Sequence, residues 1–149
     1  MVASSLVWEL TKNHNSFIRK RGNGKTKRAG SVVFSVEKGN IKSLNQHKYS
    51  GLANDTVYDV VATEDGRAAL LKKSASKANA PSKSMATIAL NKADFRKVEK
   101  TIKNSTSAVF YRRDLEAAAL GKWTKVYQAN KRVKGVKKGV PPKMGRGTL

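Results

Sequence analysis

The chain has 149 residues, with 31 Lys and Arg against 10 Asp and Glu, so its formal net charge is +21. The absence of Cys excludes disulfide frameworks, thiolate metal sites and Cys nucleophiles. No apolar run approaches the roughly 18 residues of a membrane-spanning helix, and the N-terminus lacks the basic and apolar regions of a secretory signal. Because charge of one sign repels itself in water, we expect a polyanionic partner, with nucleic acid favoured over an anionic membrane.

The positive charge is concentrated at the two ends of the chain and in one central stretch. Residues 12–28 contain seven basic residues and no acid, and residues 131–149 contain another seven and no acid. Residues 31–72 are neutral, whereas residues 73–130 carry twelve basic and four acidic residues. This distribution indicates a folded body with basic arms. We therefore expect a single domain over 1–130 and an extended basic tail over 131–149, where adjacent prolines and several glycines disfavour a core.

The N-terminal half predicts a short helix followed by two strands. Ser4 or Ser5 is expected to cap a helix that ends near Asn13. A strand over 16–19, a basic loop around 22–24 and a β-branched strand over 31–36 follow it.

A β-hairpin is the clearest element in the middle of the chain. Apolar runs over 56–63 and 68–71 flank the dipeptide Asp65-Gly66. Such a dipeptide favours a type I′ turn, which needs positive φ at both central residues. The low-complexity stretch 73–83 is expected to be an exposed loop, and residues 85–90 form the next strand.

Two helices are predicted in the C-terminal half. Asn91 is expected to cap the first, with Asp94 three residues later as a weak capping box and with Leu90 and Phe95 as a hydrophobic staple. Its apolar stripe is Phe95, Val98 and Ile102, and a basic stripe about 120° away contains Lys92, Arg96, Lys100 and Lys103. A break is expected over 104–107.

The last helix is expected from about Arg113 to Ala129, with Asp114 and Glu116 in the first turn, where the helix dipole favours acids. Its apolar face is Leu115, Ala118, Ala119 and Val126, with Trp123 at the flank. Together the elements predict an α+β fold, with a small antiparallel sheet packed with about three helices, a basic N-terminal loop and an extended basic C-terminal tail.

No residue pattern supports catalysis or metal binding. The segment Gly24-Lys25-Thr26 is similar to the end of a phosphate-binding Walker loop, but the glycine required five positions before Gly24 is Arg19. His14 and His47 stand apart from other candidate ligands, and a Gly-x-Ser-x-Gly elbow is missing from the sequence. We therefore expect no enzymatic activity, no cofactor, no metal and no small-molecule substrate.

One group of acids remains as a candidate carboxylate site. Asp55, Asp59, Glu64 and Asp65 lie around the predicted hairpin. General acid and base chemistry needs such paired carboxylates. The preferred interpretation is that they keep the neutral stretch soluble and point away from the polyanion.

The basic segments carry the functional signal, because solubility alone does not need so much unbalanced charge. Neutralising phosphates releases counterions and gives salt-dependent affinity with little sequence preference. The residues expected to bind RNA are Lys12, Arg19, Lys20, Arg21, Lys25, Lys27, Arg28, Lys92, Arg96, Lys100, Lys103, Arg112, Arg113, Lys131, Arg132, Lys134, Lys137, Lys138, Lys143 and Arg146.

Aromatic residues near these cations are candidates for stacking on unpaired bases. They are Phe17, Tyr49, Tyr111 and Trp123. Packing in the core is the alternative; we favour it for Phe17, and both interpretations stay open for the other three.

Three passages carry a family resemblance. The first passage is Trp8 followed by Asn13-His14-Asn15-Ser16-Phe17-Ile18-Arg19-Lys20-Arg21. The second passage runs from Asn40-Ile41-Lys42 through Tyr49-Ser50-Gly51-Leu52. The third passage is Tyr111-Arg112-Arg113-Asp114-Leu115, which leads into Ala117-Ala118-Ala119. In order and spacing over about residues 6–130, they resemble the eukaryotic large-subunit ribosomal proteins numbered twenty-eight in the e-type nomenclature. Arg113 stands where that family has Pro, a residue suited to the first position of a helix.

The resemblance implies a structural constituent of the cytosolic large ribosomal subunit that binds ribosomal RNA beside neighbouring ribosomal proteins and supports translation. It implies a cytoplasmic location after nucleolar passage, no membrane association and no homo-oligomer. The alternative is a ribosome-assembly factor that binds pre-ribosomal RNA, although such relatives are usually longer and contain Cys clusters. A chromatin or DNA-compaction protein is disfavoured because it explains none of the three passages, and an enzyme is disfavoured because no residue pattern supports a catalytic site.

Overall fold

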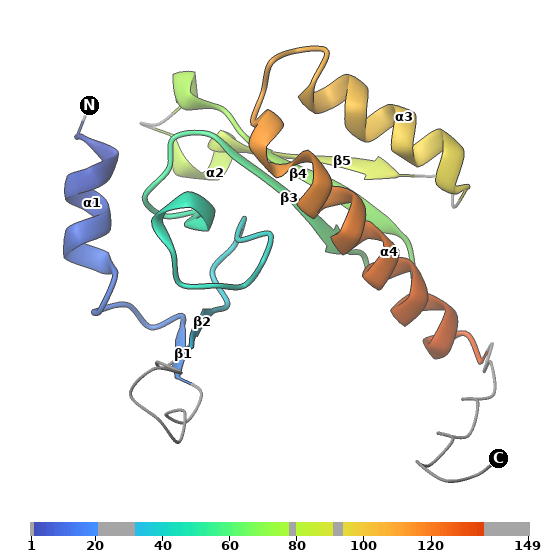
Figure 1. Cartoon of the computed structure of the whole chain (residues 1–149), viewed down its shortest axis with the longest axis horizontal. Helices are drawn as coiled ribbons and strands as arrows, with labels where there is room; N and C mark the ends of the chain where they lie inside the picture. Colours follow the sequence, from blue (N-terminus) through green and yellow to red (C-terminus); the bar gives the residue numbers. More distant parts are fainter. Residues whose placement is uncertain (1, 21–31, 78–79, 91–93, 136–149) are drawn as a thin grey trace, which may run out of the picture.

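The computed structural model describes residues 2–20, 32–77, 80–90 and 94–135. Within them the chain is α+β, as predicted, with two antiparallel sheets rather than one (Figure 1). The helices are α1 Ser4–Thr11, α2 Pro81–Ser84, α3 Phe95–Thr106 and α4 Glu116–Val133, and the strands are β1 Ile18–Lys20, β2 Val33–Ser35, β3 Val57–Ala62, β4 Ala68–Lys73 and β5 Met85–Leu90.

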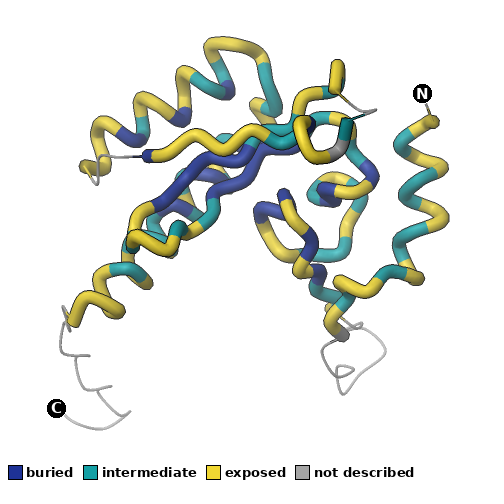
Figure 2. The backbone as a smooth tube through the Cα atoms, turned by 180° about the vertical axis from the view of Figure 1, so that it is seen from behind, coloured by how far each residue is buried: buried dark blue, intermediate teal, exposed yellow. Residues whose placement is uncertain are grey.

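The main sheet has the strand order β3-β4-β5, with antiparallel neighbours. Val60 of β3 lies opposite Leu70 of β4, which lies opposite Ile88 of β5. Figure 2 shows the buried stretches of the central strands between exposed outer elements. The second sheet pairs β1 with β2 and matches the two predicted N-terminal strands in a shorter form.

The predicted hairpin is present, but its turn differs from type I′. Ala62 pairs with Ala68, so residues 63–67 form the loop between the strands. Gly66 has φ +68°, whereas Asp65 is not among the residues with positive φ. The Gly66 N–H donates to the Thr63 carbonyl and the Thr63 N–H to the Arg67 carbonyl, at 3.0 and 2.9 Å. The longer loop thus needs the left-handed conformation at glycine alone.

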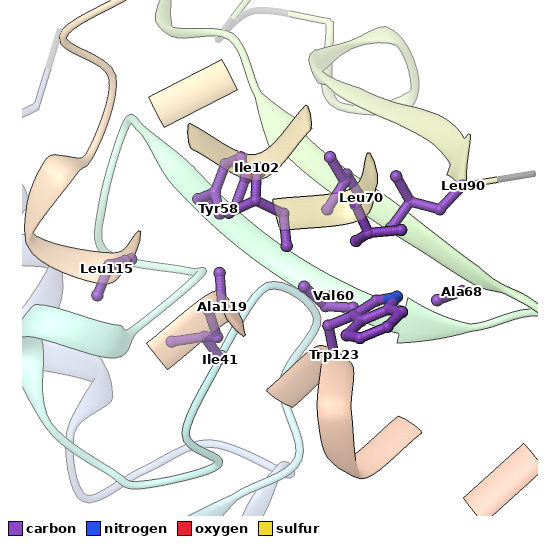
Figure 3. Packing of buried hydrophobic residues seen from close by; sticks show 11 residues of the cluster. Ile41, Tyr58, Val60, Ala68, Leu70, Leu90, Ile102, Leu115, Ala119 and Trp123 are labelled. Carbon is purple, nitrogen blue, oxygen red and sulfur yellow. The ribbon is translucent and has the colours of Figure 1, made fainter. Parts of the chain in front are cut away.

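The core lies where α3 and α4 pack against one face of the main sheet (Figure 3). Val98 and Ile102 of α3 are buried, as their spacing predicts. Trp123 was predicted at the flank of the last helix, but only 3% of it is exposed. Leu115, Ala119 and Trp123 follow each other at intervals of four, so the indole continues the buried stripe.

The start and the end of α3 also differ from the prediction. The N-cap is Asp94, whose carboxylate accepts a hydrogen bond from the Arg96 N–H at 3.2 Å, and not Asn91. Phe95 is therefore the first helical residue, which removes the predicted staple with Leu90, and its ring lies 5.6 Å from that of Trp123. The helix continues through the predicted break to Thr106, which is buried and whose hydroxyl donates to the Ile102 carbonyl at 2.8 Å.

Three smaller predictions are also corrected. Ala3, without a side-chain hydrogen bond, is the N-cap of α1, which ends at Thr11 rather than near Asn13. The stretch expected to be a loop over 73–83 contains a 3-10 turn, Ala75–Lys77, and the start of α2, where Pro81 takes the first helical position. Helix α4 follows a 3-10 turn at Arg113–Leu115 and extends to Val133, so the first residues predicted as extended tail are helical.

Candidate nucleic-acid interface

The segment that joins α3 to α4 is attached to the main sheet by Tyr111. Its hydroxyl accepts a hydrogen bond from the Val57 N–H at 3.1 Å and also lies within hydrogen-bond distance of the Val57 and Lys73 carbonyls. Burial raises the pKa of this hydroxyl, and the Lys72 ammonium lies 4.4 Å from the ring centroid. Tyr111 is thus a structural residue, and its ring is unsuited to stacking on a base.

Arg112, predicted to bind RNA, uses its guanidinium inside the protein. It donates to the Thr56 carbonyl at 2.7 Å, to the Lys48 carbonyl at 2.8 Å and to both carboxylate oxygens of Asp114. Only 14% of the side chain is exposed. Burial by itself would raise the pKa of Asp114, but the hydrogen bonds and charge of Arg112 lower it, with a smaller effect of Lys48. The structure therefore places Arg112 as a clamp that joins three segments of the chain.

The basic stripe of α3 lies on the surface. Arg96, Lys100 and Lys103 are exposed on the side away from the buried Val98 and Ile102. Lys103 forms an ion pair with Glu99 at 2.6 Å, and this hydrogen bond and charge raise the pKa of Lys103. Among the described residues, neither Arg96 nor Lys100 has a carboxylate within ion-pair distance. Their charges are therefore available to a partner.

A second exposed group of cations lies at the C-terminal end of α4. Lys131, Arg132 and Lys134 are all exposed there, and the Lys131 ammonium lies 4.6 Å from the Tyr127 ring centroid. Gly135, with φ +81°, follows the last turn. The helix dipole favours cations at this end, so these side chains stabilise α4 as well as adding positive surface charge.

The N-terminal cations are only partly covered by the structure. Lys12 is paired with Glu9, Arg19 donates to the Ser16 and Ile18 carbonyls at 3.3 Å each, and Lys20 lies in β1. The other predicted RNA-binding residues lie outside the described part of the chain: Arg21, Lys25, Lys27, Arg28, Lys92, Lys137, Lys138, Lys143 and Arg146.

The candidate stacking aromatics do not form one surface. Trp123 belongs to the core, and Tyr49 is half-buried with the Lys42 ammonium 5.2 Å from its ring centroid. Phe17 was expected in the core, but it is 40% exposed. The most exposed aromatic side chain of the described residues is one that sequence reasoning missed, Phe110, at 78%. The sequence offers only a weak sign of it, since Phe110 follows a polar stretch and fits no helical or strand periodicity.

The acids around the hairpin do not form a common site. Asp59 is buried and forms an ion pair with Lys122 of α4, whereas Asp55, Glu64 and Asp65 are exposed. Burial raises the pKa of Asp59, and the charge of Lys122 partly opposes this. In the described parts of the chain, His, Asp and Glu form no group of three able to hold a metal ion. No described helix is long and apolar enough to cross a membrane.

Buried polar contacts explain the passage between Asn40 and Leu52. The carboxylate of Glu37, 6% exposed, accepts hydrogen bonds from the Asn40 amide at 3.0 Å, the Ser50 hydroxyl at 3.1 Å and the Leu52 N–H at 3.3 Å. A Cβ atom on Gly51 would lie 2.0 Å from the Lys38 carbonyl oxygen. The residue types of this passage therefore fit the packing of one loop.

Comparison with known proteins identifies the family. The model of the Ribosomal L28e protein family matches residues 6–129, which run from α1 into α4. The chain belongs to this family. The resemblance predicted from three sequence passages is thereby confirmed, and the family consists of ribosomal proteins, not enzymes.

The relatives support this assignment over most of their length. The chain is 33% identical to "Large ribosomal subunit protein eL28" of Dictyostelium discoideum over 128 residues, 86% of this chain and 89% of the relative. It is 35% identical to the Caenorhabditis elegans protein of the same name over 105 residues, 70% of this chain and 75% of the relative. The Schizosaccharomyces pombe protein of that name is 26% identical over 136 residues, 91% of this chain and 98% of the relative.

Proposed function

We propose that this chain is a structural constituent of the cytosolic large ribosomal subunit, that it binds ribosomal RNA electrostatically, and that it thereby supports translation. The main support for this proposal is the net charge of +21 on a member of the Ribosomal L28e protein family. In this proposal the chain occupies the subunit beside other ribosomal proteins, enters it during nucleolar assembly and forms no homo-oligomer.

The described cations divide into two groups with different roles. Lys73 donates to the Gly51 and Asn54 carbonyls, Lys122 pairs with buried Asp59, and Arg112 clamps the segment before α4. These three stabilise the fold without RNA. Arg96 and Lys100 represent the second group, because they are exposed, have no ion-pair partner among the described residues and are free to neutralise phosphates.

The proposed RNA-binding surface combines the exposed α3 stripe, the end of α4 and the two basic arms. Arg96 and Lys100 are its best-defined members, because both are exposed on one helix face without an acidic partner among the described residues. Arg binds phosphate through two parallel hydrogen bonds, whereas Lys acts as a point charge. In this proposal Arg112 acts indirectly, because it holds the loop before α4 in place. The other predicted cations contact the RNA directly.

A salt titration tests the electrostatic mechanism. The full-length chain is titrated with deproteinised large-subunit ribosomal RNA at several salt concentrations, and log K is plotted against log salt. Each phosphate contact adds about 0.7–0.9 to the slope. The double variant R96Q/K100Q should therefore flatten the slope by about 1.4–1.8. The matched control K77Q/K83Q removes the same charge from exposed lysines outside the proposed surface and should leave the slope unchanged.

Two results would contradict the proposal. A wild-type slope near zero would exclude electrostatic RNA binding, and equal slopes for the two double variants would exclude a defined role for the α3 face. Sedimentation separates the proposal from the assembly-factor alternative. A subunit constituent stays with translating polysomes in near-stoichiometric amounts, whereas an assembly factor is absent from them.

A further inference from the structure

The loop that joins α3 to α4 (Figure 1) contains two exposed large apolar side chains. Val109 is 65% exposed and Phe110 is 78% exposed, while their neighbour Tyr111 is held against the sheet through Val57. Adjacent aromatic residues thus have opposite positions, one directed inward and one outward. The Phe110 ring is therefore accessible to a partner, while the Tyr111 ring is not.

The backbone of this loop is strained in a way that presents Phe110. Phe110 has φ +53° and Arg112 has φ +46°, a left-handed conformation that costs a non-glycine residue free energy. The Tyr111 N–H donates to the Thr106 carbonyl at 2.9 Å, and the Arg112 guanidinium holds the Thr56 carbonyl. These contacts at Tyr111 and Arg112 hold the backbone next to Phe110, so the direction in which the Phe110 side chain leaves the chain is fixed before any partner binds.

The charge next to the ring favours an anionic partner. The guanidinium carbon of Arg113 lies 5.2 Å from the Phe110 ring centroid. Arg113 is exposed and has no ion-pair partner among the described residues. Of the acids near the loop, Asp114 is already paired with Arg112 and lies 3.7 Å from the Lys48 ammonium, and the Glu116 carboxylate accepts hydrogen bonds from the Thr106 and Ser107 hydroxyls. The tip of the loop thus combines an exposed aromatic ring with an unpaired guanidinium.

We propose that Phe110 and Arg113 form a stacking platform for one unpaired base of ribosomal RNA, with Phe110 contacting the base and Arg113 an adjacent phosphate. An aromatic ring beside a guanidinium is a common arrangement for holding unstacked bases. An apolar pocket on a neighbouring protein is a less suitable partner. If such a pocket enclosed the Phe110 ring, it would also remove the unpaired Arg113 charge from water, which costs free energy. The proposal rests on the RNA-binding function proposed above and adds a contact that depends on stacking rather than on charge.

A set of Phe110 variants tests the platform in the full-length chain, with deproteinised large-subunit ribosomal RNA as the probe. Phe110→Ala should weaken binding about 5- to 150-fold, the range reported for loss of one aromatic-base stack. Phe110→Tyr should keep wild-type affinity, because its ring also stacks. Phe110→Leu, which keeps the apolar volume but not the ring, should resemble the alanine variant. Since Phe110 neutralises no phosphate, the salt slope should stay constant in all three.

The variants also separate this proposal from the more general one. If the wild type shows a steep salt slope but all Phe110 variants bind equally, the platform is wrong and electrostatic binding stands. If the affinity of the wild type does not depend on salt, the proposed electrostatic binding of ribosomal RNA is itself wrong. Phe110→Gly gives an independent folding control, because glycine accepts φ +53° without strain. Its melting temperature should be no lower than that of the wild type, although its affinity should fall as in Phe110→Ala.

A cross-linking measurement in assembled particles identifies the partner class directly. A photoreactive phenylalanine analogue is incorporated at position 110 of the full chain, and purified large subunits are irradiated. The proposal expects the cross-linked product to be RNA, at a small number of unpaired nucleotides. A cross-link to a ribosomal protein, or none above the level found with the analogue at exposed Lys77, outside the proposed RNA-binding surface, would overturn it.

Discussion

The hydroxyl of Tyr111 contacts both main-chain groups of Val57, the first residue of β3. This contact joins residues 54 positions apart in the sequence and attaches the connection between the two long helices to the edge of the main sheet. It also determines which of the neighbouring aromatic side chains, Phe110 or Tyr111, is available at the surface.

The first prediction removes this hydroxyl. Tyr111→Phe leaves the Val57 N–H without its side-chain acceptor, and a partly buried donor without a partner costs about 1–3 kcal/mol. We expect the free energy of unfolding to fall by that amount in urea denaturation. Tyr49→Phe is the control, because Tyr49 is also half-buried but its hydroxyl makes no hydrogen bond to another described residue. An equal loss in both variants would contradict the role assigned to Tyr111.

The second prediction concerns the ion pair between Lys122 and Asp59. Breaking a buried pair from one side leaves an uncompensated charge, and Lys122→Met should destabilise the fold by about 3 kcal/mol at neutral pH. Lys125→Met is the control, since Lys125 is exposed on the same helix.

The pH dependence of this variant gives an independent readout. Burial raises the pKa of Asp59 above its ordinary value of 3.8, so the folded state binds its proton more tightly than the unfolded state. Stability from this group is then fully present below 3.8 and is lost as pH rises through the folded pKa. Because Lys122 opposes the shift, its removal should deepen this loss and extend it to higher pH. A variant whose stability rises between pH 4 and 7 relative to wild type would contradict this sign.

The sequence predicted the regular parts of the fold better than the functions of individual side chains. The stripe of Val98 and Ile102 follows from helical periodicity alone, and both residues are buried. The cap of the same helix was misplaced because Asn91 and Asp94 are both good capping residues, and local sequence does not decide between them. Trp123 was misplaced because the predicted face also contained Ala118 and Val126, which are only partly buried, whereas the buried residues follow the spacing of Ala119 and Trp123.

The candidate site was harder to predict, because long-range contacts decide which cations are free. Arg112 and Arg113 are neighbours with the same charge, yet Arg112 reaches the Thr56 and Lys48 carbonyls, 56 and 64 positions away in sequence. Composition cannot show such contacts. Phe110 was missed for the same reason, since its exposure depends on the anchoring of Tyr111 to Val57 and on a left-handed backbone conformation that a Phe in the sequence does not predict.

The third prediction compares two glycines. Gly51→Ala would place a methyl group 2.0 Å from the Lys38 carbonyl oxygen, so the two strands of the loop must separate. We expect a loss of several kcal/mol or a failure to fold, as in other cases of severe overpacking. Gly121→Ala makes the same substitution where there is space for it, because Gly121 is exposed on α4 and no atom lies within 4 Å of the added carbon. It should stabilise the fold by up to about 1 kcal/mol. Thermal unfolding that ranks the two variants in the reverse order would contradict the loop packing described for Gly51.

The fourth prediction concerns the buried carboxylate of Glu37. One of its oxygens accepts from the Asn40 amide, and the other accepts from the Ser50 hydroxyl and the Leu52 N–H. A Gln side chain has one acceptor oxygen and one donor group in place of two acceptors. In Glu37→Gln the new amide must therefore face either the Asn40 amide or the Leu52 N–H, and neither of these donors can accept.

The expected cost of this mismatch is about 1–3 kcal/mol, because at least one buried donor loses its partner. Glu64→Gln makes the same change in charge at an exposed position and should leave the free energy of unfolding within about 0.5 kcal/mol of wild type. Hydrogen exchange sharpens the assignment, since loss of the acceptor should raise the exchange rate of the Leu52 amide in Glu37→Gln but not in Glu64→Gln. If Glu37→Gln is as stable as the wild type with a protected Leu52 amide, then the three hydrogen bonds to this carboxylate do not hold the loop between Asn40 and Leu52, and another contact does.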